Sequence, residues 1–276
     1  MSTVASIQRL PRAAHTGRVT QFRVVLSEWT KLHSLRSTRW SLVAGILLTI
    51  AFPILFAAVT SSHWGTMSAH ERADRHPLDI ALAGVNVSQL AIAVLGVLVI
   101  TGEYSTGMIR ASLTAVPKRL PVLWAKTAVY AVVTFVLMVP PVLIAFFASQ
   151  AILSKHDILQ ISFSHGGVAR AVIGGAVYLA LLAVLTVALG TIVRNTAGGI
   201  AVFAAIFFVI PPLLNVLPTS WNNAISQYLP SNAGRALFAL HTDPHNLHPQ
   251  WGGLLFVGYC AVALAIAAVL LVRRDT

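Results

Sequence analysis

The chain has little charge, one cysteine and no sizeable polar segment. Only 10% of its 276 residues are charged, and the mean hydropathy is +0.78, which excludes an ordinary soluble globular domain. Cys260 is the single cysteine, so no intrachain disulfide forms. The stretches between the apolar runs are too short to build a soluble domain with its own core.

Several motifs that carry chemistry are also missing from the sequence. There is no G-x-x-x-x-G-K-[ST] and no strand-associated G-x-G-x-x-G, so we expect this chain to hold no nucleotide itself. The H-E-x-x-H and G-x-S-x-G patterns are absent too, and no histidine lies inside an apolar run. No carboxylate lies there either, which disfavours a carrier coupled to protons or sodium. We therefore expect no catalytic, cofactor or metal site in this chain.

What the sequence does contain is six apolar runs. Each is long enough to cross a hydrocarbon core about 30 Å thick as a helix, which needs roughly 20 residues. The runs cover residues 40–60, 80–101, 128–150, 171–193, 197–216 and 252–272. Unpaired backbone is too costly in lipid, so we predict an all-α integral membrane protein with six transmembrane helices. Residues 20–276 are expected to form one domain, preceded by a flexible basic tail over residues 1–19.

The net charge of +11 is better explained by membrane orientation than by nucleic-acid binding. If the chain alternates through six spans, fourteen of its 19 Lys and Arg residues fall on the side that holds both termini. The positive-inside rule then predicts cytoplasmic termini in a multi-pass protein of the cell membrane, with lipid as a neighbour.

Residues 20–33 predict an amphipathic helix. Apolar residues recur at helical spacing, and polar residues occupy the other side. The apolar set is Phe22, Val25, Leu26, Trp29 and Leu32; the polar set is Gln21, Arg23, Ser27, Glu28 and Lys31. Such a helix favours the membrane surface. It fits either a plain anchor or a lever that couples a cytoplasmic partner to the first span.

Proline and amide residues interrupt the apolar runs. Pro53 predicts a kink, and the pairs Pro140–Pro141 and Pro211–Pro212 predict broken helices. Asn86 and Gln89 share a helix face, where they either bond to a neighbouring helix or line a substrate path. The short turn at 194–196 predicts an antiparallel hairpin. The pieces within 217–250 are too short to span and predict re-entrant or interfacial helices.

Most histidines fall on the side opposite the termini. His241, His245 and His248 have a spacing that resembles a metal site, but prolines interrupt the segment and no acidic or cysteine cluster completes it. We interpret them as loop residues, with pH sensing or metal binding as alternatives.

Two stretches carry a family resemblance. Ser27 to Trp40 reads SEWTKLHSLRSTRW, and Gly102 to Arg110 reads GEYSTGMIR, followed by Pro117 and Lys126. With the six-span layout, the amphipathic N-terminal helix and the broken segment before the last span, the chain resembles the membrane subunits of bacterial ATP-binding-cassette exporters of the ABC-2 permease type. The resemblance covers roughly residues 20–274.

The resemblance implies partners and roles. Such permeases dimerise, with an identical copy or a similar paralogue, and bind two separate ATPase subunits that hold ATP and Mg²⁺. The amphipathic helix would be the connecting helix, with Phe22, Trp29 and Lys31 at its contacts. The coupling helix would lie near 103–113, with contacts from Glu103, Tyr104, Ser105 and Arg110. The substrate path would include Asn86, Gln89, Phe203, Phe207 and Asn215, and residues 218–240 would form an outer lid.

The implied function is export of an apolar or amphipathic substrate, such as a drug, an antibiotic, a lipid or a lipid-linked glycan. The alternative is a membrane sensor or scaffold subunit that has an exporter-like fold and transports nothing. A membrane-embedded enzyme is disfavoured, because the runs offer no buried polar triad.

Overall fold

Every regular element in the described part of the chain is a helix. The computed structural model describes residues 21–34, 36–73, 75–105, 107, 119–155, 160–240 and 246–274. Its long helices are α2 (Arg36–His63), α4 (Pro77–Ser105), α6 (Arg119–Ser154), α7 (Val168–Val193), α8 with its continuations (Thr196–Leu214) and α12 (Pro249–Arg273). All six are long and apolar enough to span a membrane. The protein is therefore a multi-pass all-α membrane protein, as predicted.

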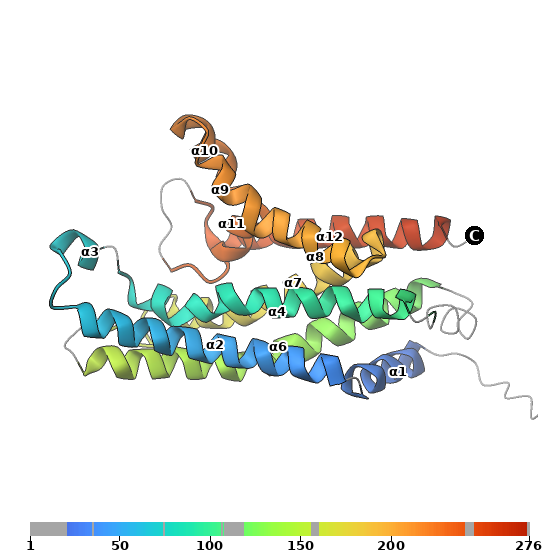
Figure 1. Ribbon diagram of the computed structural model, residues 1–276, viewed down its shortest axis with the longest axis horizontal. Coiled ribbons are helices and arrows are strands. Elements are labelled where there is room, and N and C mark those ends of the chain that lie inside the picture. Colours follow the sequence, from blue (N-terminus) through green and yellow to red (C-terminus); the bar gives the residue numbers. More distant parts are fainter. Residues whose placement is uncertain are drawn as a thin grey trace, which may run out of the picture.

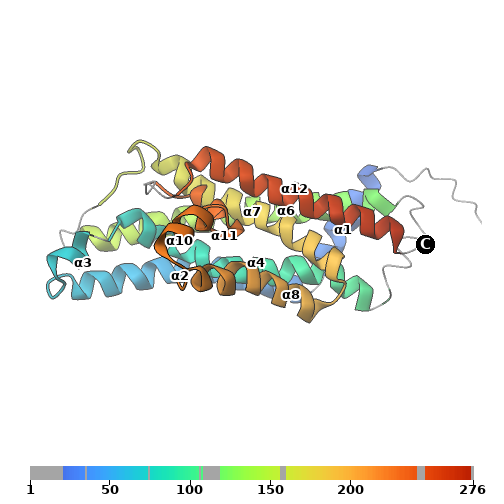
Figure 2. The ribbon, with the colours of Figure 1, turned by 90° about the horizontal axis from the view of Figure 1, so that it is seen from above.

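The long helices other than the fifth span run side by side along the longest axis of the molecule (Figures 1 and 2). The helix α7 forms the centre, with 67% of its apolar window buried, and α4 follows with 56%. Helix α1 (Gln21–Ser34) lies at the end where the chain leaves α12, and the short helix α3 (Ala69–Ala73) lies at the opposite end. We call these the α1 end and the α3 end.

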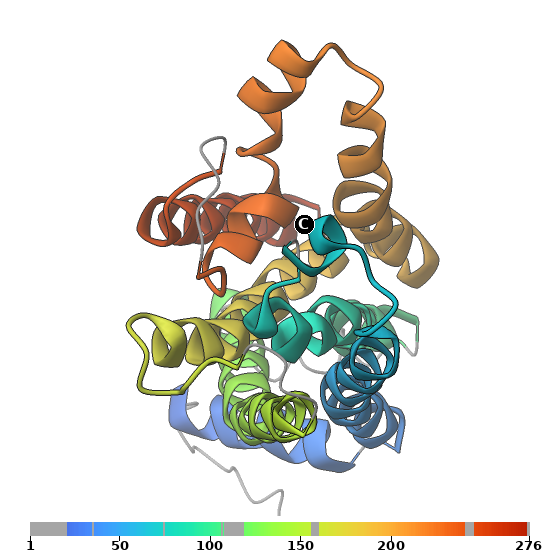
Figure 3. The ribbon, with the colours of Figure 1, turned by 90° about the vertical axis from the view of Figure 1, so that its left-hand side faces the viewer.

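Helix α1 lies across the bundle rather than along it (Figure 3). It packs mainly against α6, with fewer contacts to α2. A helix of this orientation, with exposed Phe22, Leu26 and Trp29, is typical of one that lies in the membrane interface. The predicted amphipathic helix is confirmed as an element, and its bounds differ from the prediction by one residue at each end.

The helices α4 and α6 are longer than the apolar runs from which they were predicted. The second predicted run ends at residue 101, whereas α4 continues to Ser105. The third begins at residue 128, whereas α6 begins at Arg119. Hydropathy marks the part of a helix that lipid covers, while the helix itself continues as long as its hydrogen bonds and packing hold. Glu103 and Lys126 therefore lie on helices.

The prolines disturb the helices less than predicted. A break at Pro140–Pro141 is wrong, because α6 is continuous from Arg119 to Ser154. Met138 and Val142 flank the pair and are buried in the core, so packing holds both halves in one helix. In the fifth span, α8 (Thr196–Ala204) passes into a π-helix, η1 (Ala205–Val209), and then into α9 (Ile210–Leu214), which carries Pro211–Pro212 in its first turn.

The hairpin between α7 and α8 forms as predicted. Arg194 adopts a left-handed backbone with φ of 58°, and the Asn195 side chain caps α8 by accepting a 2.8 Å hydrogen bond from the Gly198 N–H. Beyond the turn, α8, η1 and α9 diverge from the bundle (Figures 1 and 3). Only 17% of this span's apolar window is buried.

Two short helices follow α9. They are α10 (Thr219–Ser226) and α11 (Pro230–Ala236), and each begins directly after or at a proline. They confirm the prediction of short helices before the last span. The helix α11 packs against α12 and α7, whereas α10 contacts mainly α9 and extends away from the bundle (Figure 1).

Helices α2 and α4 approach each other closely at Gly84. Pro53 has no N–H, so the Thr49 carbonyl four residues earlier loses its normal helix partner. Gly84 of α4 lies against that carbonyl: a Cβ at Gly84 would stand 2.2 Å from the Thr49 oxygen. Position 84 therefore requires glycine, because any side chain there would collide with the Thr49 carbonyl. Without a side chain, the Cα of Gly84 packs directly against this carbonyl, which has lost its helix partner to Pro53.

We expect Gly84→Ala to lower the stability of the protein by about 1–3 kcal/mol, because the added methyl group forces α2 and α4 apart. The matched control is Gly258→Ala on α12, where the new Cβ has no atom of another helix within 4 Å. Thermal unfolding of both variants in mild detergent gives the comparison. Equal melting temperatures for the two variants would contradict this packing.

Candidate functional site at the α1 end

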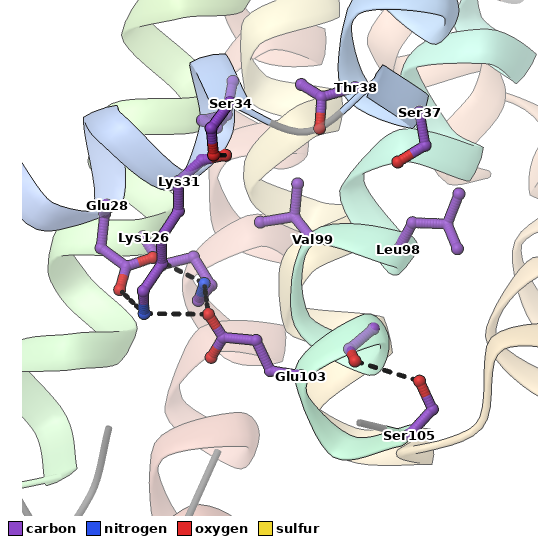
Figure 4. A pocket seen from close by; sticks show the side chains of 12 residues that line it. Glu28, Lys31, Ser34, Ser37, Thr38, Leu98, Val99, Glu103, Ser105 and Lys126 are labelled. Carbon is purple, nitrogen blue, oxygen red and sulfur yellow. Dashed lines mark hydrogen bonds and ion pairs between the residues drawn. The ribbon is translucent and has the colours of Figure 1, made fainter. Parts of the chain in front are cut away.

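Four charged side chains meet at the α1 end and join three helices (Figure 4). Glu28 and Lys31 come from α1, Glu103 from the end of α4 and Lys126 from the start of α6. The Lys126 Nζ lies 2.6 Å from Glu28 Oε2 and 2.9 Å from Glu103 Oε1. The Lys31 Nζ lies 2.8 Å from Glu28 Oε1 and 3.1 Å from Glu103 Oε1. Each lysine therefore bridges both carboxylates, and we call the set the charge quartet.

Three of the four side chains are removed from solvent. The side chains of Lys126, Glu28 and Glu103 are 3%, 4% and 7% exposed, and that of Lys31 is 30% exposed. Transferring an ion into a protein interior costs several kcal/mol, and only close opposite charges and hydrogen bonds offset that cost. With two cations and two anions the quartet is neutral. Removing the buried lysine leaves two carboxylates to share Lys31.

Lys31 is the member of the quartet that solvent reaches. Partial burial lowers the pKa of its ammonium group. The hydrogen bonds and negative charges of Glu28 and Glu103 raise the pKa, and together they outweigh the effect of burial. The net effect places the Lys31 pKa above its ordinary value, so this side chain stays charged throughout the physiological pH range.

The inward position of Glu28 corrects the sequence analysis, which placed this residue on the polar side of the helix. Val24, Glu28 and Leu32 are spaced four residues apart and form the buried face of α1. Val24 packs on Val122 and Ala125 of α6. Helix α1 therefore has two faces: one docks on the bundle through the quartet, and the other is apolar and exposed.

A cavity adjoins the quartet. It measures about 270 Å³ and lies between α1, the start of α2 and the end of α4, with Ser37, Thr38, Leu98 and Val99 in its wall (Figure 4). The second oxygen of Glu103, Oε2, is buried and has no hydrogen-bond partner within the part of the chain that the structure describes. An orphaned carboxylate oxygen in a neutral ionic cluster is a position where a further donor gains a strong bond.

The predicted coupling and connecting residues are distributed around this site. Lys31 and Glu103 belong to the quartet. The Tyr104 ring lies under the Arg194 guanidinium, 5.1 Å from its Cζ, and links the end of α4 to the turn after α7. Ser105 is exposed at the end of α4. Arg110 and most of the predicted coupling helix lie outside the described residues. Phe22 and Trp29 lie on the exposed face of α1.

The structure divides the predicted substrate-path residues into two groups. Gln89 is buried between helices: it accepts a hydrogen bond from the Tyr178 hydroxyl, and its Nε2 donates to the Asn86 carbonyl at 2.8 Å. Phe203 is fully buried and stacks on Phe207 with ring centroids 4.6 Å apart. Phe207 and Asn215 line a second cavity at the α3 end, far along the bundle from the charge quartet.

Among the described residues, no group of three His, Cys, Asp or Glu side chains has the geometry to hold a metal ion. His241 and His245 lie outside the described residues, so the sequence-based alternatives for the histidine segment stay predictions. Comparison of the chain with protein-family models gives no match, and comparison with curated proteins also gives none.

Replacing Lys126 by methionine tests the quartet. We expect Lys126→Met to lower stability by about 3–5 kcal/mol, because two buried carboxylates then share one partly exposed lysine. Lys31→Met is the matched control, and we expect it to cost about 1 kcal/mol or less, since solvent reaches this group. Thermal unfolding in detergent measures both effects.

The double variant Glu28→Gln/Lys126→Met separates charge from packing. It restores neutrality by leaving the Lys31–Glu103 pair, so we expect it to be more stable than Lys126→Met alone. If Lys126→Met is as stable as the native chain, the quartet does not hold the three helices together.

Proposed function

We propose that this protein is the membrane-spanning subunit of an ATP-driven exporter of the ABC-2 permease type. Its ATPase is a separate subunit, present in two copies, and supplies the ATP and Mg²⁺ site that this sequence lacks. The transport unit contains a second permease, either an identical copy or a similar paralogue. The proposal rests on the family resemblance together with the arrangement of the α1 end.

The observation that carries the proposal is the charge quartet. Glu103 and Lys126 lie near the facing ends of α4 and α6, which are the two helices joined by the segment 106–118. The quartet binds both ends to α1, an interfacial helix. A push on the joining segment is thus transmitted to α1, α4 and α6 as one body, because separating the three helices would leave buried charges without their partners.

This arrangement suits a protein driven from one side of the membrane. In the proposed cycle, ATP closes the paired ATPase subunits and moves the segment between α4 and α6. The α1 end moves with it, and the permease pair changes from an inward-open to an outward-open state. ATP shifts this equilibrium only through its higher affinity for the closed ATPase pair. Glu103 belongs to this unit, and its buried Oε2 has no hydrogen-bond partner among the described residues.

The fifth span supports a paired assembly. The face formed by α8, η1 and α9 is apolar, and little of it is buried within the chain. We assign this face to the second permease copy and to the lining of the substrate path. A cavity between two such apolar faces favours apolar or amphipathic cargo. Drugs, antibiotics, lipids and lipid-linked glycans all have this character.

A photo-crosslinking experiment tests the orientation and the partner together. We expect a photoreactive amino acid at exposed Ser105, at the end of α4, to capture a protein with a Walker A motif from intact cells. The same amino acid at exposed Ser62, in the last turn of α2 at the α3 end, is the matched control and should capture none.

Mass spectrometry of the crosslinked band identifies the captured protein. Capture of an ATPase at Ser62 instead of Ser105 would reverse the proposed orientation. Absence of any ATPase at both positions, with the protein intact in the membrane, would favour a sensor or scaffold role over transport.

A further inference from the structure

A second polar site lies at the α3 end, away from the charge quartet. It is a cavity of about 410 Å³ between η1, α9, α10 and α11. Four asparagine side chains and one arginine line it, and they come from separate short segments. Asn215 follows α9, Asn222 and Asn223 lie on α10, and Asn232 and Arg235 lie on α11. Such a density of amides is unusual in a chain of this hydropathy.

Most of the donor and acceptor atoms of these asparagine amides make no hydrogen bond to a described residue. The Asn222 Nδ2 donates to Asn215 Oδ1 at 3.1 Å, and the Asn232 Nδ2 donates to the Ser226 carbonyl at 2.8 Å. These bonds use three of the eight donor and acceptor atoms of the four amides. Asn223 makes no side-chain hydrogen bond within the described ranges and is half-buried. The cavity therefore presents both donors and acceptors to a ligand.

Arg235 adds a positive charge to the lining of the cavity. Its side chain is exposed at the C-terminal turn of α11, and it forms no ion pair with any residue that the structure describes. A guanidinium group offers a planar fork of donors that matches a phosphate or a carboxylate. With amide donors beside it, the cavity favours an anionic group over a cation.

The surroundings place this cavity at the level of lipid head groups. Trp221 on α10 and Tyr228 after it are more than half exposed, and such aromatic residues collect at the boundary between lipid and water. The fifth span beside the cavity is apolar, with Phe208 and Leu213 exposed along it. A molecule bound here thus has its polar part among amides and its apolar part against the span.

The wall of the cavity contains an irregular helical turn. Phe207 and Phe208 lie in the π-helix η1, which widens the span just before Pro211–Pro212. Wider turns of this kind occur often at functional sites, because they redirect side chains that a regular helix would place elsewhere. Here the turn brings one buried and one exposed phenyl ring under the polar groups.

We propose that this cavity binds the anionic head group of an amphipathic molecule, with Arg235 holding its phosphate or carboxylate and the asparagines holding its remaining oxygens. Two sources offer this chemistry: an anionic phospholipid of the bilayer and an exported amphiphile. Binding itself needs only the folded chain. Assignment of the site to cargo rests in addition on the proposed exporter function.

The test uses the full chain purified in a neutral detergent. The probe is short-chain phosphatidylglycerol, and phosphatidylcholine with the same chains is the reference. Isothermal titration calorimetry should show tighter binding of the anionic probe. We expect Arg235→Ala to weaken that binding roughly tenfold or more, since a charged hydrogen bond is lost, and Arg235→Lys to fall between.

The matched control is Arg75→Ala, which removes an exposed arginine from the loop between α3 and α4, also at the α3 end, and should leave the affinity unchanged. Asn223→Leu gives a second variant that keeps the charge and should also weaken binding. Melting temperatures without lipid confirm that each variant folds. Equal affinity for the two lipids, or an equal effect of Arg75→Ala and Arg235→Ala, would overturn the proposal.

A further experiment distinguishes a bilayer phospholipid from an exported amphiphile as the natural ligand. In the complex with its ATPase, loss of probe-stimulated ATP hydrolysis in Arg235→Ala assigns the head group to cargo. Unchanged hydrolysis with lost binding assigns it to a bilayer lipid. The calorimetry needs no ATPase, so failure of the exporter proposal leaves its result standing.

Discussion

The burial of Lys126 constrains the rest of the α1 end. An ammonium group that is 3% exposed, on a helix that also spans the membrane, persists only with carboxylates in direct contact. Those carboxylates come from two other helices, so α1 and the end of α4 must both be in place before Lys126 is satisfied. The position of α1, the register of α4 against α6 and the polar wall of the adjoining cavity all follow from that requirement.

The two ends of the molecule are built on different principles. At the α1 end, the four charges of the quartet are paired, three of them are buried, and together they hold three helices as one unit. In the amide cavity at the α3 end, the polar side chains are uncharged except for the exposed Arg235, and the helices around them are short and separated by prolines. Such a difference suits a protein in which a partner acts on the α1 end from one side of the membrane and a ligand binds at the α3 end on the other side.

The sequence predicts the part of the fold that depends on local chemistry. Six spans follow from run length, α1 from helical periodicity, and the turn at Asn195 from its spacing. The charge quartet does not follow, because Glu28 and Lys126 are 98 positions apart and their contact depends on how α1 docks. Glu28 shares its face with Val24 and Leu32, but the stronger apolar pattern of Phe22, Leu26 and Trp29 concealed that face.

Proline effects and the amide cavity were equally hard to predict. Whether a proline pair breaks a helix depends on how the residues on either side are packed. At Pro140–Pro141 the helix α6 stays continuous, whereas a π-helix precedes Pro211–Pro212 in the fifth span. Asn215, Asn222 and Asn232 converge only through the turns between α9, α10 and α11. The family resemblance singled out Asn215 as a residue of the substrate path, but nothing in the sequence indicated the other asparagines that share its cavity.

The most direct test of the account is purification of the tagged protein from its native membrane in mild detergent, with quantification of the proteins bound to it. The account predicts one ATPase subunit with a Walker A motif for each copy of this chain, and ATP hydrolysis by the purified complex. An intact, dimeric protein that carries no ATPase would contradict the exporter assignment.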